Sequence, residues 1–103
     1  MGYSISITGS DLSLNITYNV SPIYYKAIDG GLMSLSYKTV IEAMPILKEA
    51  IFSILVYRED YEKLNPPNGW GDCASALHVL IDLARECDLQ RDALNYHGRI
   101  IIS

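Results

Sequence analysis

Few residues in this chain have the types and spacing that acid–base chemistry requires. His78 and Asp82 lie four positions apart, so on a helix they share one face and the carboxylate can orient the imidazole for proton transfer. No nucleophile stands at an identifiable spacing from this pair, and His97 has no partner that can be named. Phosphate-binding loops, dinucleotide fingerprints, nucleophile elbows and His-Glu zinc motifs are absent from the sequence. We therefore expect a surface pair at His78 and no enzymatic activity.

The two cysteines, Cys73 and Cys87, do not form a recognisable site either. If both lie on one helix, a rise of about 1.5 Å per residue separates them by about 21 Å, which is beyond the reach of a disulfide. Neither has the His or Cys neighbours that a zinc site requires. We expect both to be small buried residues in a reducing compartment, and we expect no metal and no cofactor.

The segment NPPNGWGD, residues 65–72, is the most unusual stretch of the chain and contains its only tryptophan. In a structural interpretation, the prolines hold a rigid corner, Asp72 caps the next helix, and Trp70 folds back to close the end of the core. In a functional interpretation, exposed Asn65, Asn68 and Trp70 form a polar and aromatic pocket with the free N–H groups of that helix. The structural interpretation is favoured, because a capping carboxylate already occupies the donors that an anionic ligand would need.

Tyrosine is abundant, at eight of 103 residues, and several tyrosines flank the ends of expected elements. An aromatic ring with a polar tip suits protein interfaces and base stacking, although packing at the boundary of the core explains most of these residues. With the 65–72 segment they define a candidate binding site at one end of the expected sheet. Its residues are Tyr18, Asn19, Asn65, Asn68, Trp70 and Asp72.

The strands that position this site follow from the alternation of apolar and polar residues. Alternation over residues 3–8 and again over residues 12–20, with turn residues between, predicts a β-hairpin with one polar face. Residues 99–103 contain three consecutive isoleucines, which predict a terminal strand paired with the hairpin.

The segments between the hairpin and the last strand have helical signals. A serine followed by a proline predicts a short helix over residues 22–28, and residues 59–64 predict a polar turn of helix. The helix that follows Asp72 should run to about Asp88. Because its apolar residues keep the spacing of three and four most closely, we expect it to be the central helix.

A longer helix should begin at a capping box formed by Thr39 and Glu42. We expect Pro45 to kink this helix or to move its start toward Met44, because a proline in a helix interior costs about 3 kcal/mol. The expected buried stripe consists of Ile41, Met44, Leu47 or Lys48, Ile51 and Leu55.

Length and pattern together predict a single domain over residues 1–103. We predict an α+β fold in which a small antiparallel sheet, made of the N-terminal hairpin and the C-terminal strand, is covered on one face by two main helices.

The composition excludes several classes of function. A net charge of −4 argues against a phosphate-binding surface, so we expect no direct contact with nucleic acid. The longest apolar run without a charge is Ala50 to Tyr57, far short of the roughly 20 residues that span a bilayer. The first residues lack the pattern of a secretion signal. We expect a cytoplasmic protein without membrane contact.

Three blocks of sequence carry a resemblance to a known group. They are ITYN followed by Ser21-Pro22, EAMPIL at residues 42–47, and LNPPNGWGD at residues 64–72. In these blocks the chain resembles a group of small uncharacterised proteins encoded by bacteriophages, prophages and some bacteria, and the likeness extends from Leu14 to Cys87. The resemblance implies a phage-related accessory protein in the cytoplasm of the host cell, and it brings no catalytic residues.

Small size, mild acidity, many tyrosines and the lack of catalytic motifs favour a non-enzymatic protein that acts by protein–protein interaction. We expect a host or phage protein as its partner, and inhibition of a host defence protein as its effect. The alternative is a module that binds or sequesters a small ligand such as a nucleotide, using Tyr18, Asn19 and Trp70. Self-association into a homo-oligomer stays open.

Overall fold

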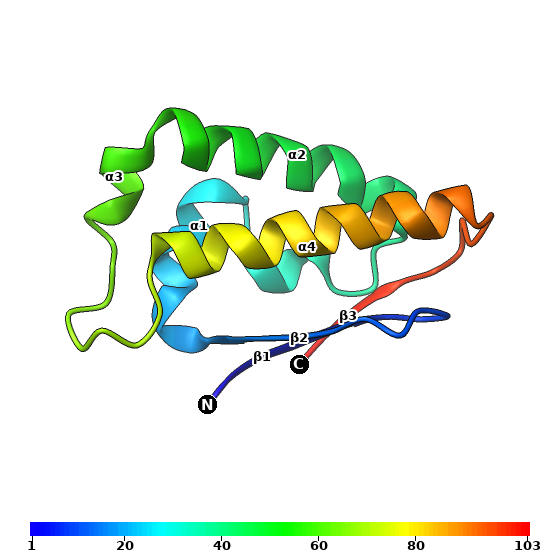
Figure 1. The fold of residues 1–103 in the computed structure, drawn as a ribbon, viewed down its shortest axis with the longest axis horizontal. Helices are drawn as coiled ribbons and strands as arrows, with labels where there is room; N and C mark the ends of the chain where they lie inside the picture. The colour runs from blue at the N-terminus through cyan, green and yellow to red at the C-terminus, as the bar shows by residue number, and fades with distance from the viewer.

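A computed structural model describes residues 1–103, and it places one face of a three-stranded sheet against the helices (Figure 1). The predicted α+β arrangement is confirmed. None of the helices is both long and apolar enough to cross a lipid bilayer. The strands and helices in chain order are β1 (Gly2–Ile7), β2 (Ser13–Thr17), α1 (Ser21–Ala27), α2 (Val40–Val56), α3 (Arg58–Glu62), α4 (Cys73–Asp92) and β3 (Ile100–Ile102), with short 3-10 helices η1 (Tyr18–Val20) and η2 (Leu32–Leu35).

The sheet is antiparallel, with β1 in the centre between β2 and β3. Ile5 of β1 pairs with Leu14 of β2 and with Ile102 of β3, so apolar residues of all three strands meet on the helix side. The opposite face is polar, and there Ser4 Oγ donates a hydrogen bond to Asn15 Oδ1 at 3.0 Å. The expected alternation of a half-buried hairpin is therefore present.

The two edges of the sheet differ in how they are protected. The outer edge of β3 is covered by the segment before α2, because Tyr37 N–H donates to Ile100 O, Ile100 N–H donates to Lys38 O and Val40 N–H donates to Gly98 O. β2 pairs only with β1, which leaves its second edge without a strand partner.

The second strand of the hairpin is shorter than predicted. Alternation suggested a strand up to Val20, but β2 ends at Thr17 and η1 follows it. Thr17 Oγ1 accepts a hydrogen bond from Asn19 N–H at 3.2 Å, and this side-chain cap competes with a continued strand. Val20 is consequently turned into the core while Tyr18 is left largely exposed.

The helix α2 begins where its capping box places it. Thr39 Oγ1 accepts from Glu42 N–H, and the Glu42 carboxylate accepts from Thr39 N–H, which also lowers the pKa of Glu42. The expectation of a start near Met44 is wrong, because α2 is helical from Val40 with Pro45 inside it. Pro45 is exposed and lies near the helix start, so its missing N–H removes one hydrogen bond without opening the core.

The buried stripe of α2 is rotated relative to the prediction. Ile41 and Leu55 were expected in the core but are exposed, whereas Ala43 and Ala50 are fully buried. The buried residues recur at spacings of three and four along one side of the helix, and Ile41 and Leu55 lie outside that side. The buried residues of α2 are Val40, Ala43, Met44, Leu47, Ala50 and Ile54.

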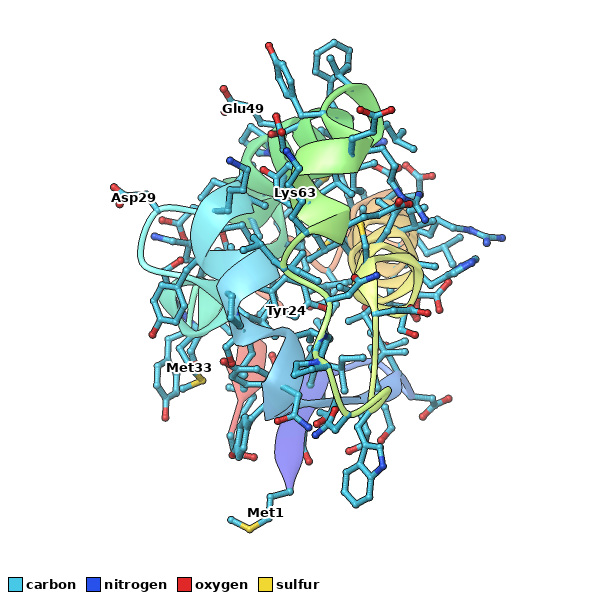
Figure 2. All side chains as sticks on the ribbon, turned by 90° about the vertical axis from the view of Figure 1, so that its left-hand side faces the viewer. Met1, Tyr24, Asp29, Met33, Glu49 and Lys63 are labelled. Carbon is cyan, nitrogen blue, oxygen red and sulfur yellow. The ribbon has the colours of Figure 1, made fainter.

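The helix α4 is central, as predicted, although it continues four residues past Asp88 to Asp92. It packs on α2 and on β2, and its buried residues extend from Cys73 to Cys87. Tyr24 of α1, in the middle of the molecule in Figure 2, donates a hydrogen bond from its hydroxyl to Ala76 O of α4 at 3.0 Å. Burial, with a smaller contribution from the nearby Tyr3, raises the pKa of Tyr24 far above its usual value.

The Tyr24→Phe variant should lose about 1 kcal/mol of unfolding free energy, the usual net value of one intramolecular hydrogen bond. In the unmodified protein, Tyr24 stays neutral in the folded state while the unfolded chain ionises it at a pH of about 10. Tyr24 therefore makes its full contribution to the free energy of unfolding below that pH, and this contribution declines as the pH rises above it. Urea titrations at a series of pH values from neutral to strongly alkaline measure this decline. The free energy of unfolding of Tyr24→Phe should fall less at alkaline pH than that of the unmodified protein. Equal slopes for both proteins would contradict this assignment.

Candidate functional site

The 65–72 corner is held by the polar side chains that were candidates for ligand binding. Asn65 Oδ1 accepts a hydrogen bond from Cys73 N–H at 2.8 Å, and Asn68 Oδ1 accepts from Trp70 N–H at 3.0 Å. Asp72 Oδ1 accepts from Ser75 N–H at 2.7 Å, which caps α4 and lowers the pKa of Asp72. The accepting atoms of these three residues are thus used to build the corner.

A turn inside the corner gives it the rigidity expected from its prolines. Gly69 N–H donates to Pro66 O at 3.2 Å, which closes this turn. Gly69, at φ 75°, adopts the left-handed conformation that glycine tolerates without steric cost. Gly71 is also left-handed, and a Cβ there would lie 2.6 Å from Thr17 Cγ2, so the corner lies directly against the end of β2.

Trp70 is not buried, and the prediction that it closes the end of the core is wrong. Its side chain is 69% exposed, although the backbone on either side of it is fixed. The core at this end is already filled by Val20, Tyr61 and Cys73, each almost completely buried. With Gly71 packed against Val20, no space is left for an indole ring beneath the corner.

Beside Trp70 lies a shallow hollow of about 380 Å³ on the end of the sheet. It combines an aromatic ring with backbone and small polar groups of β1 and β2, and none of its side chains carries a charge. Residues lining it are Met1, Gly2, Tyr3, Ser4, Asn15, Ile16, Thr17 and Trp70.

The predicted site residues come from two neighbouring segments, since Gly71 of the corner contacts Thr17 and Val20 on either side of Tyr18 and Asn19, but most of them do not line the hollow. Tyr18 and Asn19 do not line the hollow, and Tyr18 packs edge-on against Tyr3 with ring centroids 4.7 Å apart. Of the six predicted residues, only Trp70 both faces solvent and lines the hollow.

Sequence reasoning missed the strand residues that complete this surface. Asn15 and Thr17 line the hollow, and with Ser13 they lie on the strand whose outer edge is free. The alternation of apolar and polar residues in β2 could have identified its solvent-facing residues. It could not have shown that β2 is an edge strand, because that depends on the order of the strands in the sheet.

The remaining candidates for acid–base or thiol chemistry are the pair His78 and Asp82 and the two cysteines. His78 and Asp82 are both exposed on α4 and make neither a hydrogen bond nor an ion pair with each other. Cys73 and Cys87 are buried free thiols, as expected. Burial raises the pKa of both, that of Cys87 to about 11, which disfavours the thiolate. The structure contains no group of three or more His, Cys, Asp or Glu residues that could hold a metal ion.

Comparison with protein-family models, with curated proteins and with solved structures finds no match for this chain. The geometry therefore defines a small α+β domain with an exposed tryptophan beside a free strand edge. The likeness to phage proteins stays an expectation from the sequence.

Because Trp70 is exposed, Trp70→Ala should change the free energy of unfolding by less than about 0.5 kcal/mol. A buried tryptophan would cost about 3 to 5 kcal/mol when truncated to alanine. Chemical denaturation followed by circular dichroism distinguishes the two cases. Fluorescence of the unmodified protein, with its single tryptophan, should also be quenched by iodide nearly as well as free indole is. Emission shielded from iodide would show that the ring is covered.

Proposed function

We propose that this chain is a non-enzymatic protein that binds a partner protein through Trp70 and the adjoining end of β2. We call this region the Trp70 surface; it consists of Trp70, the hollow beside it and the free edge at Ser13, Asn15 and Thr17. The observation that supports it most is the 69% exposure of a large aromatic side chain on a fixed corner. Tryptophan is the residue type most enriched among those that dominate binding energy at interfaces.

The rigidity of the corner strengthens this proposal. Hydrogen bonds to Asn65, Asn68 and Asp72, and the close contact of Gly71 with Thr17, hold the backbone on both sides of Trp70. A side chain presented on an ordered backbone loses less conformational entropy on binding than one on a mobile loop. The corner therefore presents Trp70 to a partner at low entropic cost.

The strand edge offers a second mode of contact to the same partner. Many proteins keep a free strand edge from pairing by placing charged residues or prolines on it. Residues 13–17, SLNIT, contain neither. Ser13 and Asn15 are exposed on this strand. An extended segment of a partner could add to β2 by main-chain hydrogen bonds while an apolar side chain contacts Trp70.

The narrower form of the proposal concerns the partner. The resemblance to small phage proteins supports a host or phage protein in this role, with inhibition of a host defence protein as the outcome. The net charge of −4 would favour a basic partner surface, since complementary charge speeds association.

A nucleotide ligand is less well supported by the hollow beside Trp70. No lysine, arginine or histidine side chain lines it, and the α-amino group of Met1 is the only cation among the lining residues, so phosphate groups would lack the cluster of cations that usually binds them. A ligand present at 100 times its dissociation constant should add about 2.7 kcal/mol of stability. Thermal unfolding in a panel of nucleotides should show no such shift, and a clear shift would favour the ligand alternative.

Trp70→Ala should abolish capture of the partner from host lysate while leaving the fold intact. Tyr96→Ala is the matched control, because Tyr96 is an exposed aromatic residue that follows the C-terminal end of α4, whereas Trp70 precedes the start of this helix. Ser13→Lys, which places a charge on the free edge, should weaken capture if the edge takes part. Mass spectrometry of captured proteins compares the variants. A partner retained equally by Trp70→Ala and the unmodified protein would refute the proposal.

A further inference from the structure

The free edge of β2 has a defined main-chain register. Ser4 of β1 lies opposite Asn15, but its N–H donates to Ser103 O and its carbonyl accepts from Ser103 N–H, both at 3.0 Å. In an antiparallel ladder the N–H and C=O of one residue point to the same side, so Ser4 and Asn15 form a non-hydrogen-bonded pair. Asn15 therefore directs its main-chain groups away from β1, and Ser13, two residues earlier, does the same. These groups can pair with an added strand.

The two sides of the sheet differ in chemistry beside this edge. The side chains of Ser13 and Asn15 lie on the polar face, where Asn15 also lines the hollow next to Trp70. Leu14, between them, faces the helix side, where α4 packs on β2. A strand added at this edge would alternate in the same way, so one side chain faces Trp70 and its two neighbours face α4.

The flank of α4 beside this edge is acidic. Ser10, in the turn of the hairpin, donates a hydrogen bond to Glu86 Oε1 at 3.0 Å. At the other end of β2, Gly71 contacts Thr17 just before α4 begins, so α4 lies along β2 between these two contacts (Figure 1). Asp82 is exposed one turn before Glu86, which places both carboxylates on the side of α4 that borders the edge. Neither carboxylate takes part in an ion pair.

The same carboxylates disfavour a second copy of this chain as the occupant of the edge. Two β2 strands paired antiparallel about a two-fold axis at Asn15 would bring the acidic flanks of the two α4 helices toward each other. Asp82 and Glu86 of each copy would then lie near the same residues of the other, and like charges at an interface oppose association. A segment with positive charges on its helix side meets these carboxylates with opposite charge.

We propose that β2 binds a basic extended segment of the partner protein. This inference rests on the proposed function and names the chemistry of its partner. The segment adds to the free edge through the main-chain groups of Ser13 and Asn15. Its lysine or arginine side chains, at alternate positions, face Asp82 and Glu86, and an apolar side chain between them faces Trp70. The recognised pattern is therefore a cation, an apolar residue and a second cation.

An end-blocked peptide of alternating lysine and valine, of about seven residues, tests this inference with the full chain. Isothermal titration calorimetry measures its affinity, and the amide resonances of Ser13 and Asn15 in nuclear magnetic resonance spectra locate it. The matched peptide of alternating glutamate and valine should bind at least about tenfold more weakly, because it brings like charges together. Added salt should reduce the difference between the two peptides.

Methylation of main-chain nitrogens distinguishes strand addition from simple electrostatic attraction. The peptide residue opposite Asn15 forms a hydrogen-bonded pair with it and has its side chain on the Trp70 side, so the valine N–H groups should point toward β2. Methylation of the valine nitrogens should therefore abolish binding. Methylation of the lysine nitrogens, which point away from β2, should leave binding largely intact.

The contribution of α4 is tested by removing its two carboxylates. The double variant Asp82→Asn, Glu86→Gln should weaken binding of the lysine peptide by about fivefold, within the range of two exposed charge pairs. A glutamine oxygen can still accept the hydrogen bond of Ser10, so the hairpin contact is kept. The control is Glu49→Gln, Glu59→Gln, which removes the same charge from exposed positions on α2 and α3, away from the sheet (Figure 1).

Four outcomes would overturn this inference: no binding of the lysine peptide, equal binding of the glutamate peptide, equal binding after methylation of the valines, or equal binding by the Asp82→Asn, Glu86→Gln variant. None of them decides the proposed function, because capture of a partner protein through Trp70 is measured with Trp70→Ala. A partner that Trp70→Ala retains would refute the proposed function, whatever the peptides show.

Discussion

The close contact between α2 and α4 is the constraint on which the rest of this structure depends. The contact between α2 and α4 is the most extensive between any two elements, and both helices bury alanines, Ala43 and Ala50 on α2 and Ala76 on α4. The helix α4 also packs on β2, and Ala76 accepts the hydrogen bond of Tyr24. Because one side of α2 is used in this packing, the apolar residues on its other side are left exposed.

Local signals predicted most elements of the fold. The capping box at Thr39 and the cap at Asp72 involve neighbours in sequence, so their hydrogen bonds could be anticipated, and the helices begin where these caps place them. The orientation of α2 could not be anticipated in the same way. Apolar residues lie on more than one side of this helix, and only the partner helix decides whether the alanine side or the Phe52 side is buried.

The candidate site shows the same division between local and long-range information. The turn at Pro66 and the roles of Asn68 and Asp72 follow from residue types within the corner. The exposure of Trp70 does not, because it depends on Gly71 resting against Thr17, more than fifty residues earlier in the chain, and on Val20 already filling the space below. An aromatic residue in a proline-rich corner can be buried and close the core, or it can be exposed and contact a partner. The position of the neighbouring strand decides between the two.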